Sequence, residues 1–473
     1  MKILILGGGT VGETVAYNLA NYSNYEITVI DKNEASLQKL SQSLDIQTIL
    51  GSVSSPTVLK NAGAQDTELL IAVTGEDDTN LVSSKMAKEI FNIPNIIARI
   101  RQSEIVEYHF KSVLNGNETQ MTPLDLFGVN ESICPEQIVT DQLFQLLLIP
   151  GALQVINFAE GLGENLEVQM IVTKVENSCP LVGKQFSDFV DIISQEINFK
   201  ICAIYRNEAL IIPTPKTKII SGDEVYFITL KEYVKDLMKI FRPDETENKK
   251  VMIAGGGNIG YRLAQTTEPY FQTKIIEKNE SRAEFLAENL DTSLVFRGSV
   301  TDENILIDEN VKEIDMFFAL TNDDEDNIMS SLIAKKLGAK RVATIINRSI
   351  YVDILVGHTI DIVISPHLTT IGSILSHIRR GDVVTVHPMR RGEAEILEVI
   401  IHGDKKNSKI IGRKPSQISW PYGIDVAAII SNGEFITDHK HDLKESDHII
   451  FFVFRRQAVP ELEKLLQVKW KFF

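Results

Sequence analysis

The chain of 473 residues contains two copies of one long pattern, and this duplication limits the folds open to it more than any other feature. The opening KILILGGGTVGETVAYNLA recurs as KVMIAGGGNIGYRLAQTTE, and LLIAVTGEDDTNLVSSKMAKEI recurs as MFFALTNDDEDNIMSSLIAKKL. The second pairing sets Thr74 opposite Thr321 and Asn80 opposite Asn327. Similarity over such a length indicates the duplication of a whole domain rather than a chance motif.

Each copy continues into a second, different unit at lower similarity. PGALQVINFAEG is echoed by RGDVVTVHPMRRG, and SGDEVYFITL by ESDHIIFFVF, each of the latter two being a turn before an alternating apolar strand. FRPDETENKK is charged and poor in apolar residues, so we predict a linker between the halves there. The order predicts a nucleotide-binding domain at 1–125, a small α+β domain at 140–240, and their repeats at 249–366 and 380–465.

In the first domain, a short apolar run is followed at once by glycines and then by a segment with helical spacing. In this context Gly7 permits a tight turn, Gly9 lets the backbone approach a pyrophosphate, and Gly12 lets the helix lie close to the strand. Helix N–H groups and the helix dipole favour phosphate there. We therefore predict a Rossmann-like α/β domain with a doubly wound parallel sheet. Its predicted phosphate site consists of Gly7, Gly8, Gly9, Thr10, Val11 and Gly12.

The next predicted strand ends in Asp31, nineteen residues beyond Gly12. A carboxylate at this position accepts hydrogen bonds from ribose hydroxyls and disfavours a 2′-phosphate by like-charge repulsion. NAD(H) is therefore favoured over NADP. Because ATP and ADP carry the same ribose, Asp31 leaves the choice between them and NAD(H) open.

The second copy repeats this arrangement with Glu277 in the place of Asp31. Its predicted phosphate site consists of Gly255, Gly256, Gly257, Asn258, Ile259 and Gly260. The copies differ in a later predicted strand. Our alignment of NIIARIR with VATIINR sets Ile346 opposite Arg99 and retains only Arg348. An arginine at the carboxyl end of a strand either pairs with phosphate oxygens or is a solvated strand-end residue. In the first case, the first site binds an anionic nucleotide more tightly.

Thr74 and Gly75 follow a buried-looking strand, where the fourth strand of a parallel sheet meets the nucleotide crevice, and are candidate ligand contacts. The acidic cluster GEDDTN at 75–80 is echoed by NDDEDN at 322–327. Such a cluster is either a cation site or a helix N-cap, and the apolar-periodic stretch behind it favours the cap.

Composition narrows the class further. With 48 Lys and Arg against 64 Asp and Glu, the formal charge is −16, which argues against nucleic acid as a partner. No run approaches the ~20 apolar residues of a membrane helix, and the start reads as a strand rather than a signal peptide, so we expect residence in the cytoplasm. The three cysteines are widely spaced and suggest neither disulfides nor a zinc site.

The small α+β domains lack the groups that a dehydrogenase needs beside its dinucleotide domain. The first contains no histidine, and the histidines of the second are scattered without a nucleophile or metal-ligand spacing. A basic cluster in the second is most simply a solvated face, or else a contact for an acidic partner or lipid headgroups. It comprises His377, Arg379, Arg380, Arg390 and Arg391. Paired nucleotide domains without a catalytic constellation favour a ligand sensor over an enzyme.

Several stretches resemble the RCK (KTN) family of channel and transporter regulators. They are GGGTVG with Asp31, AVTGEDDTN, IARIR, LFQLLLIPGALQVINFAEG, PLVGK, SHIRRGDVV, HPMRRGEAE and GGGNIG. The resemblance covers essentially the whole chain. It implies NAD(H) in the first site, held by Gly7 to Val11, Asp31, Thr74, Gly75 and Arg99. It also implies NAD(H) or ATP/ADP in a second site at Gly255 to Ile259 with Glu277.

The resemblance further implies a partner and a location. Members with two such domain pairs are peripheral subunits of bacterial Trk potassium-uptake systems, which implies a homotetrameric ring beneath an integral-membrane potassium translocator at the inner face of the membrane. Nucleotide binding would change the conformation of the ring and gate the translocator. The same modules in a regulator of a cation/proton antiporter, and an NAD-dependent oxidoreductase, are the alternatives.

Overall fold

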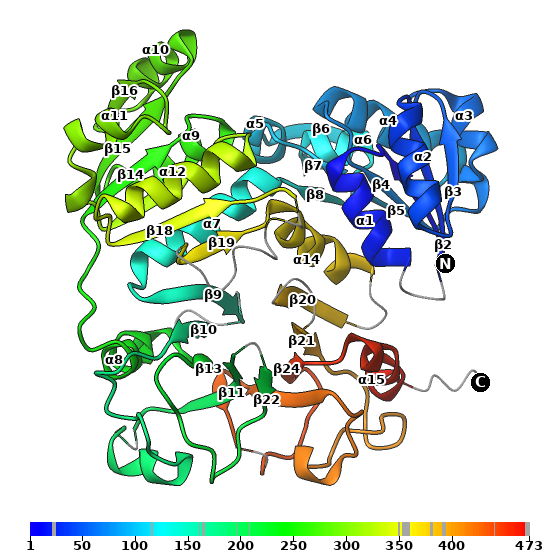
Figure 1. The fold of residues 1–473 in the computed structure, drawn as a ribbon. Helices are drawn as coiled ribbons and strands as arrows, with labels where there is room; N and C mark the ends of the chain where they lie inside the picture. Colours follow the sequence, from blue (N-terminus) through cyan, green and yellow to red (C-terminus); the bar gives the residue numbers. More distant parts are fainter. Residues whose placement is uncertain are drawn as a thin grey trace. The chain divides into compact units, whose positions relative to one another are not determined.

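The computed structural model describes residues 1–20, 25–114, 117–159, 161–162, 166–194, 196–207, 209–348, 351, 360–378, 382–389, 394–438 and 440–468 (Figure 1). The chain divides into two compact units. The first comprises Met1–Ile138 with Pro366–Leu375, and the second Val139–Ser365 with Ser376–Phe473.

The first unit is built on a parallel sheet of six strands in the order β3-β2-β1-β4-β5-β8, the order of a Rossmann fold. Its strands are β1 (Lys2–Leu6), β2 (Glu26–Asp31), β3 (Gln47–Leu50), β4 (Leu69–Ala72), β5 (Asn95–Arg99) and β8 (Glu131–Ile133). Its helices are α1 (Thr10–Ala20), α2 (Glu34–Ser43), α3 (Pro56–Asn61), α4 (Asp77–Phe91), α5 (Ser103–Glu107) and α6 (Pro123–Phe127). A hairpin of β6 (Phe110–Leu114) and β7 (Asn117–Met121) precedes α6.

The second unit contains the same sheet again, in the order β16-β15-β14-β17-β18-β19. Its strands are β14 (Lys250–Ala254), β15 (Gln272–Glu277), β16 (Leu294–Arg297), β17 (Met316–Ala319), β18 (Arg341–Ile345) and β19 (Ile362–Ile364). Its helices are α9 (Asn258–Thr267), α10 (Glu280–Asn289), α11 (Glu303–Asp308) and α12 (Asp324–Lys336). The central strands of both sheets are buried almost throughout, as helices on both faces require. The predicted tandem of doubly wound domains is confirmed.

Two antiparallel sheets of five strands complete the second unit, in the orders β12-β11-β13-β10-β9 and β20-β21-β24-β22-β23. The first antiparallel sheet consists of β9 (Ala152–Phe158), β10 (Val168–Lys174), β11 (Phe199–Arg206), β12 (Ala209–Ile211) and β13 (Glu224–Leu230), followed by α8 (Lys231–Phe241). The second antiparallel sheet consists of β20 (Asp382–Met389), β21 (Ala394–Ile400), β22 (Ile424–Ser431), β23 (Glu434–Ile436) and β24 (His448–Val453), followed by α15 (Val459–Leu466). The two orders are the same pattern read from opposite edges, so the small domains are duplicated as well.

Two helices are exchanged between the units, which the sequence did not indicate. Helix α7 (Pro135–Leu148) follows the first parallel sheet, yet its Leu143 and Leu147 share an apolar core with Ile253 and Phe318 of the second sheet. Most of α14 (Pro366–Ile378), which follows the second sheet, belongs to the first unit.

The predicted linker at 241–250 is packed against its surroundings. Arg242 pairs with Glu176 and Glu245, each at 2.8 Å, and the amide of Asn248 donates to the carbonyl of Leu147 at 2.9 Å. These contacts hold the segment between α8 and β14 in place. Within the described residues, no helix has both the length and the apolarity to cross a membrane.

Candidate nucleotide sites

The first glycine loop joins β1 to α1 with the geometry that the motif predicts. Gly7 has a φ of +107°, which suits glycine, and a Cβ on Gly12 would lie 1.8 Å from the carbonyl oxygen of Gly7. Gly9 has no heavy atom within 4 Å of where a Cβ would stand. Thr10 and Val11 open α1, so their backbone amides are among the unpaired N–H groups of the helix N-terminus. The loop therefore leaves open space at its centre for a close-fitting ligand.

Asp31 lies directly against this loop. One carboxylate oxygen accepts from the Gly8 amide at 2.5 Å, and the other accepts from the Asn33 amide at 2.7 Å. Since a carboxylate offers about four acceptor sites, two remain for ribose hydroxyls. The contact with Gly8 also holds the loop in shape, so Asp31 has a structural role in addition to the predicted binding role.

The second loop reproduces the first. Gly255 also has a φ of +107°, and a Cβ on Gly260 would lie 1.9 Å from the Gly255 carbonyl oxygen, whereas the space over Gly257 is open. Glu277 accepts from the Gly256 amide at 2.8 Å and from the Asn279 amide at 2.7 Å. Asn258 and Ile259 open α9 as Thr10 and Val11 open α1.

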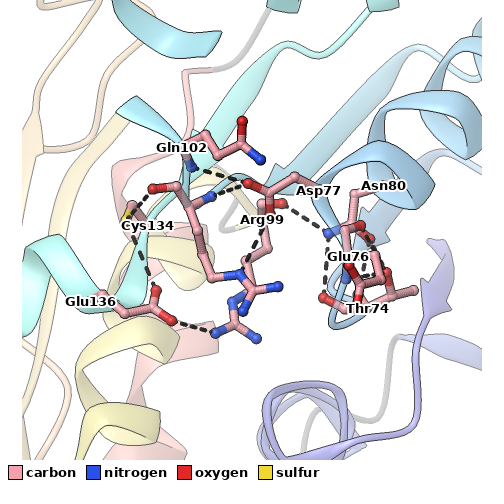
Figure 2. A network of polar contacts seen from close by, with 9 residues as sticks. Thr74, Glu76, Asp77, Asn80, Arg99, Gln102, Cys134 and Glu136 are labelled. Atoms are coloured by element: carbon pink, nitrogen blue, oxygen red, sulfur yellow. Dashed lines mark hydrogen bonds and ion pairs between the residues drawn. The ribbon is translucent and has the colours of Figure 1, made fainter. Parts of the chain in front are cut away.

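In each half, an asparagine that the sequence analysis did not select connects the ends of two neighbouring strands, and Figure 2 shows the one in the first half, Asn80. Asn80 accepts from the amide and hydroxyl of Thr74, at 3.0 and 2.7 Å, and its own amide donates to the Arg99 carbonyl at 2.8 Å. Asn327 makes the same contacts with Thr321 and the Ile345 carbonyl. Their equal spacing in the two copies was the signal available in the sequence. Gly75 beside Thr74 has open space around it.

The strand register corrects our alignment of the two halves by one residue. Ala72 pairs with Ala98, and its equivalent Ala319 pairs with Thr344. Ile345 therefore stands opposite Arg99, and our pairing of Arg99 with Ile346 was wrong. The same register puts Asn347 opposite Arg101 and Arg348 opposite Gln102. The second half still lacks a cation at the position of Arg99.

Arg99 is neither solvated nor available to a ligand without a change of partner. Its guanidinium lies 2.8 Å from the carboxylate of Glu136 in the first turn of α7, and the two side chains are 17% and 13% exposed. Its Nε is buried and makes no hydrogen bond. Cys134 lies close by, with its sulfur 3.9 Å from Glu136. Figure 2 shows this pair beside the contacts of Asn80.

The expected N-cap forms in the acidic cluster of the second half but not in that of the first. In the second half, Asp323 caps α12 by accepting from the amide of Asp326 at 2.8 Å. In the first half, Glu76 occupies the N-cap position of α4 without a side-chain cap bond. Asp77 instead accepts from the amides of Arg101 and Gln102, at 2.8 and 3.0 Å, and so fixes the loop after β5. Within the described part of the chain, no three His, Cys, Asp or Glu side chains are grouped to hold a metal.

The second site carries a cation that the first lacks. Arg282 on α10 donates from Nε to the Gly256 carbonyl at 2.6 Å, and its guanidinium lies 4.6 Å from the ring centroid of Phe285 and 5.5 Å from that of Tyr261. In the first half, Ser36 is the equivalent of Arg282, and an ion pair of Lys39 with Glu13 replaces the two aromatic rings. The second loop is therefore held by an arginine of α10 that has no counterpart at the first loop.

Two histidines of the second small domain pair with carboxylates. His448 lies 2.7 Å from Glu398, both buried, and His441 lies 2.9 Å from Asp447. In the predicted basic cluster, Arg379, Arg380, Arg390 and Arg391 lie outside the described residues, and His377 is in the last turn of α14.

Two glycine loops, each closed by a carboxylate at the end of the next strand, define a tandem α/β protein of the nucleotide-binding class. The TrkA-N domain model matches residues 3–115 and 251–366, and the TrkA-C domain model matches residues 170–242. Trk system potassium uptake protein TrkA of Halomonas elongata is 42% identical over 100% of both chains, and that of Vibrio alginolyticus is 39% identical over 99% of both. The chain belongs to the TrkA family.

Solved structures share the fold at lower identity. The GsuK RCK domain has a TM-score of 0.62 and 17% identity, with 98% of this chain and 94% of that chain covered. A GsuK channel bound to NAD also has a TM-score of 0.62 and 17% identity, over 98% of this chain and 78% of that one. The predicted RCK architecture is thereby confirmed.

Proposed function

We propose that this chain is a cytosolic subunit that senses nucleotides, binding NAD(H) in its first site and NAD(H) or ATP/ADP in its second. In this role it regulates a Trk-type potassium translocator from the inner face of the membrane, as a homotetrameric ring. The observation that carries the proposal is the pair of glycine loops with Asp31 and Glu277 held against them. Membership of the TrkA family supports the transport role, and a neighbour solved with NAD supports the ligand.

In the first site, the ribose hydroxyls donate to Asp31 and the phosphates accept from the amides of Gly9 to Val11. A phosphate within reach of Arg99 competes with Glu136 for the guanidinium, because one planar guanidinium binds either anion in a bidentate manner. Glu136 begins α7, whose later residues pack in the second unit. Exchange of partners at Arg99 therefore transmits occupancy of the site to the crossover helix.

A sensor of this kind needs only unequal affinity of each nucleotide for two conformations of the chain. A coupling free energy of ~1–3 kcal/mol changes the affinity of one site by about 5–150-fold when the other is occupied. The reaction chemistry of an oxidoreductase is not required for this, and the relatives of this chain are described as potassium uptake proteins.

The test is isothermal titration calorimetry of the full chain with NADH, NAD, ATP and ADP, alongside Asp31→Ala and Glu277→Ala. Glu34→Ala, an exposed carboxylate at the start of α2, is the matched control. We expect each site variant to lose one binding event per chain, the control to lose none, and NADH to be recovered unconsumed. Binding absent from the parent chain, or NADH turnover with a carbonyl substrate, would reject the sensor.

A further inference from the structure

The two antiparallel sheets face each other through a shared apolar core. Each sheet contributes equivalent positions to this core: Ala203 and Ala428, Ile228 and Phe452. Such burial is not directional, so the same faces would also fit a second copy of themselves from another chain. Something else must set which sheet pairs with which.

One polar pair lies where equivalent strands meet. Strands β11 and β22 occupy the same place in the two sheets and lie beside one another. Lys200 on β11 and Asp425 on β22 are themselves equivalent, because Lys200 pairs across its sheet with Ile228 and Asp425 pairs with Phe452. Their side chains meet at 2.7 Å. A position that contacts its own equivalent lies near an approximate twofold axis relating the two sheets.

At such an axis, a symmetric pairing would set a residue against itself. Pairing of two first antiparallel sheets would bring Lys200 against Lys200, and pairing of two second sheets would bring Asp425 against Asp425. The side chains are only 20% and 29% exposed, so solvent screens these like charges incompletely. When two first sheets pair with each other, their second sheets are also left to pair with each other. Both repulsive contacts therefore occur together.

A second contact at the same interface is also asymmetric. The buried Glu398 of the second sheet accepts from the backbone amide of Ala159, at the end of β9, at 3.4 Å. Glu398 pairs with Ile450, and Val172 pairs with Tyr226 at the equivalent position of the first sheet. Val172 is therefore the equivalent of Glu398. A valine offers no acceptor, so a pairing of two first sheets loses this bond.

We propose that the Lys200–Asp425 pair specifies the pairing of the first antiparallel sheet with the second and rejects another copy of the same sheet. The covalent connection between the two sheets then makes the partner the one in the same chain, because tethering raises the effective concentration. The pair thus directs how a duplicated chain closes on itself before it assembles further.

The experiment uses a crosslink across this interface in the full chain. The hydroxyl of Thr437 donates to the side-chain oxygen of Asn198, so Asn198→Cys with Thr437→Cys, joined by a short bismaleimide, reports pairing of the two sheets. Cys134→Ser is included in every variant so that this partly exposed cysteine does not react with the crosslinker. Cys179 and Cys202 are buried and stay unchanged. Non-reducing mass analysis separates crosslinks within a chain from those between chains.

In this background we compare Lys200→Asp, Asp425→Lys and the double exchange. Each single reversal should reduce the intrachain crosslinked fraction by at least about fivefold, and the double exchange should restore it. Lys85→Asp with Glu89→Lys, which exchanges an exposed pair, should change nothing. Single reversals that crosslink like the parent, or a double exchange no better than either single, would overturn the proposal, even if nucleotide binding is intact.

Discussion

The ion pair of Arg99 with Glu136 offers the sharpest test of how the first site is coupled to α7. The pair is a charge-assisted hydrogen bond of 2.8 Å between two mostly buried side chains. A bond of this kind contributes about 1.5–3 kcal/mol. Glu136→Gln keeps a neutral acceptor in place, so we expect it to lose roughly 1 kcal/mol of that interaction.

The loss has two opposite consequences. The folded chain loses stability, which for a protein of this size lowers Tm by about 1–3 °C. A nucleotide phosphate no longer has to displace a carboxylate from Arg99, so NADH affinity should rise by about fivefold, since 1.4 kcal/mol corresponds to tenfold.

The assays are calorimetry with NADH and thermal unfolding with and without NADH. Glu89→Gln removes the carboxylate of the exposed pair with Lys85 and is the matched control, with neither value expected to move. If Glu136→Gln lowers Tm while NADH affinity stays unchanged or falls, Glu136 does not compete with the phosphate and the exchange of partners is refuted.

Three further predictions follow from single contacts. Gly12→Ala should destabilise the chain by about 2–4 kcal/mol in urea unfolding, because its Cβ would overlap the Gly7 carbonyl, whereas Gly9→Ala, with open space, should unfold like the parent. Arg282→Ser should weaken ADP binding at the second site several-fold in calorimetry, because it removes the cation that lies against the loop; unchanged binding would show that the arginine only holds the Gly256 carbonyl. His387 lies in β20, and burial lowers its pKa to about 4 from 6.5. The unfolded chain therefore takes up the proton first as the pH falls, and stability declines between pH 6.5 and 4 by at most about 3 kcal/mol. His387→Phe should flatten this decline in urea titrations, and a parallel decline in both proteins would assign it to other groups.

The parts of the fold that local sequence determines were predictable. A buried strand, a glycine turn, a helix and an acidic residue occur within 31 residues of one another, so periodicity and turn chemistry reveal them together. The same reasoning located Asp31 and Glu277 at the loops. Conformation within a segment is a local property, and both copies repeat it.

The contacts that join distant segments were not predictable. Glu136 is 37 positions from Arg99, and no local pattern marks it as the partner of a strand-end arginine. The exchange of α7 and α14 depends on which apolar core each helix enters, and the apolar pattern within a helix does not specify that core. The error of one residue at Ile346 has a similar cause, because a run of apolar residues aligns equally well in two registers until pairing partners fix it.

The two halves differ in one feature that bears on signalling. The second half has Ile345 in the place of Arg99. Ile345 pairs with Ile364 as Arg99 pairs with Ile133. His367 follows Ile364 at the same distance along the chain as Glu136 follows Ile133, so His367 takes the place of Glu136. Both members of the ion pair are therefore replaced together. A ligand in the second site has no such pair to disrupt at the start of a crossover helix.

We therefore expect the first site to control α7. Hydrogen exchange at the first turn of α7, which contains Glu136, should change on addition of NADH to the parent chain and to Glu277→Ala, but not to Asp31→Ala. Saturating NADH is used so that a site that is only weakened is still filled. Calorimetry in parallel measures the loss of binding in Asp31→Ala, so that unchanged hydrogen exchange in this variant reflects an empty first site. If Glu277→Ala abolishes the change while the first site still binds NADH, the signal passes through the second half, and the Arg99–Glu136 pair is a structural bond without a role in coupling.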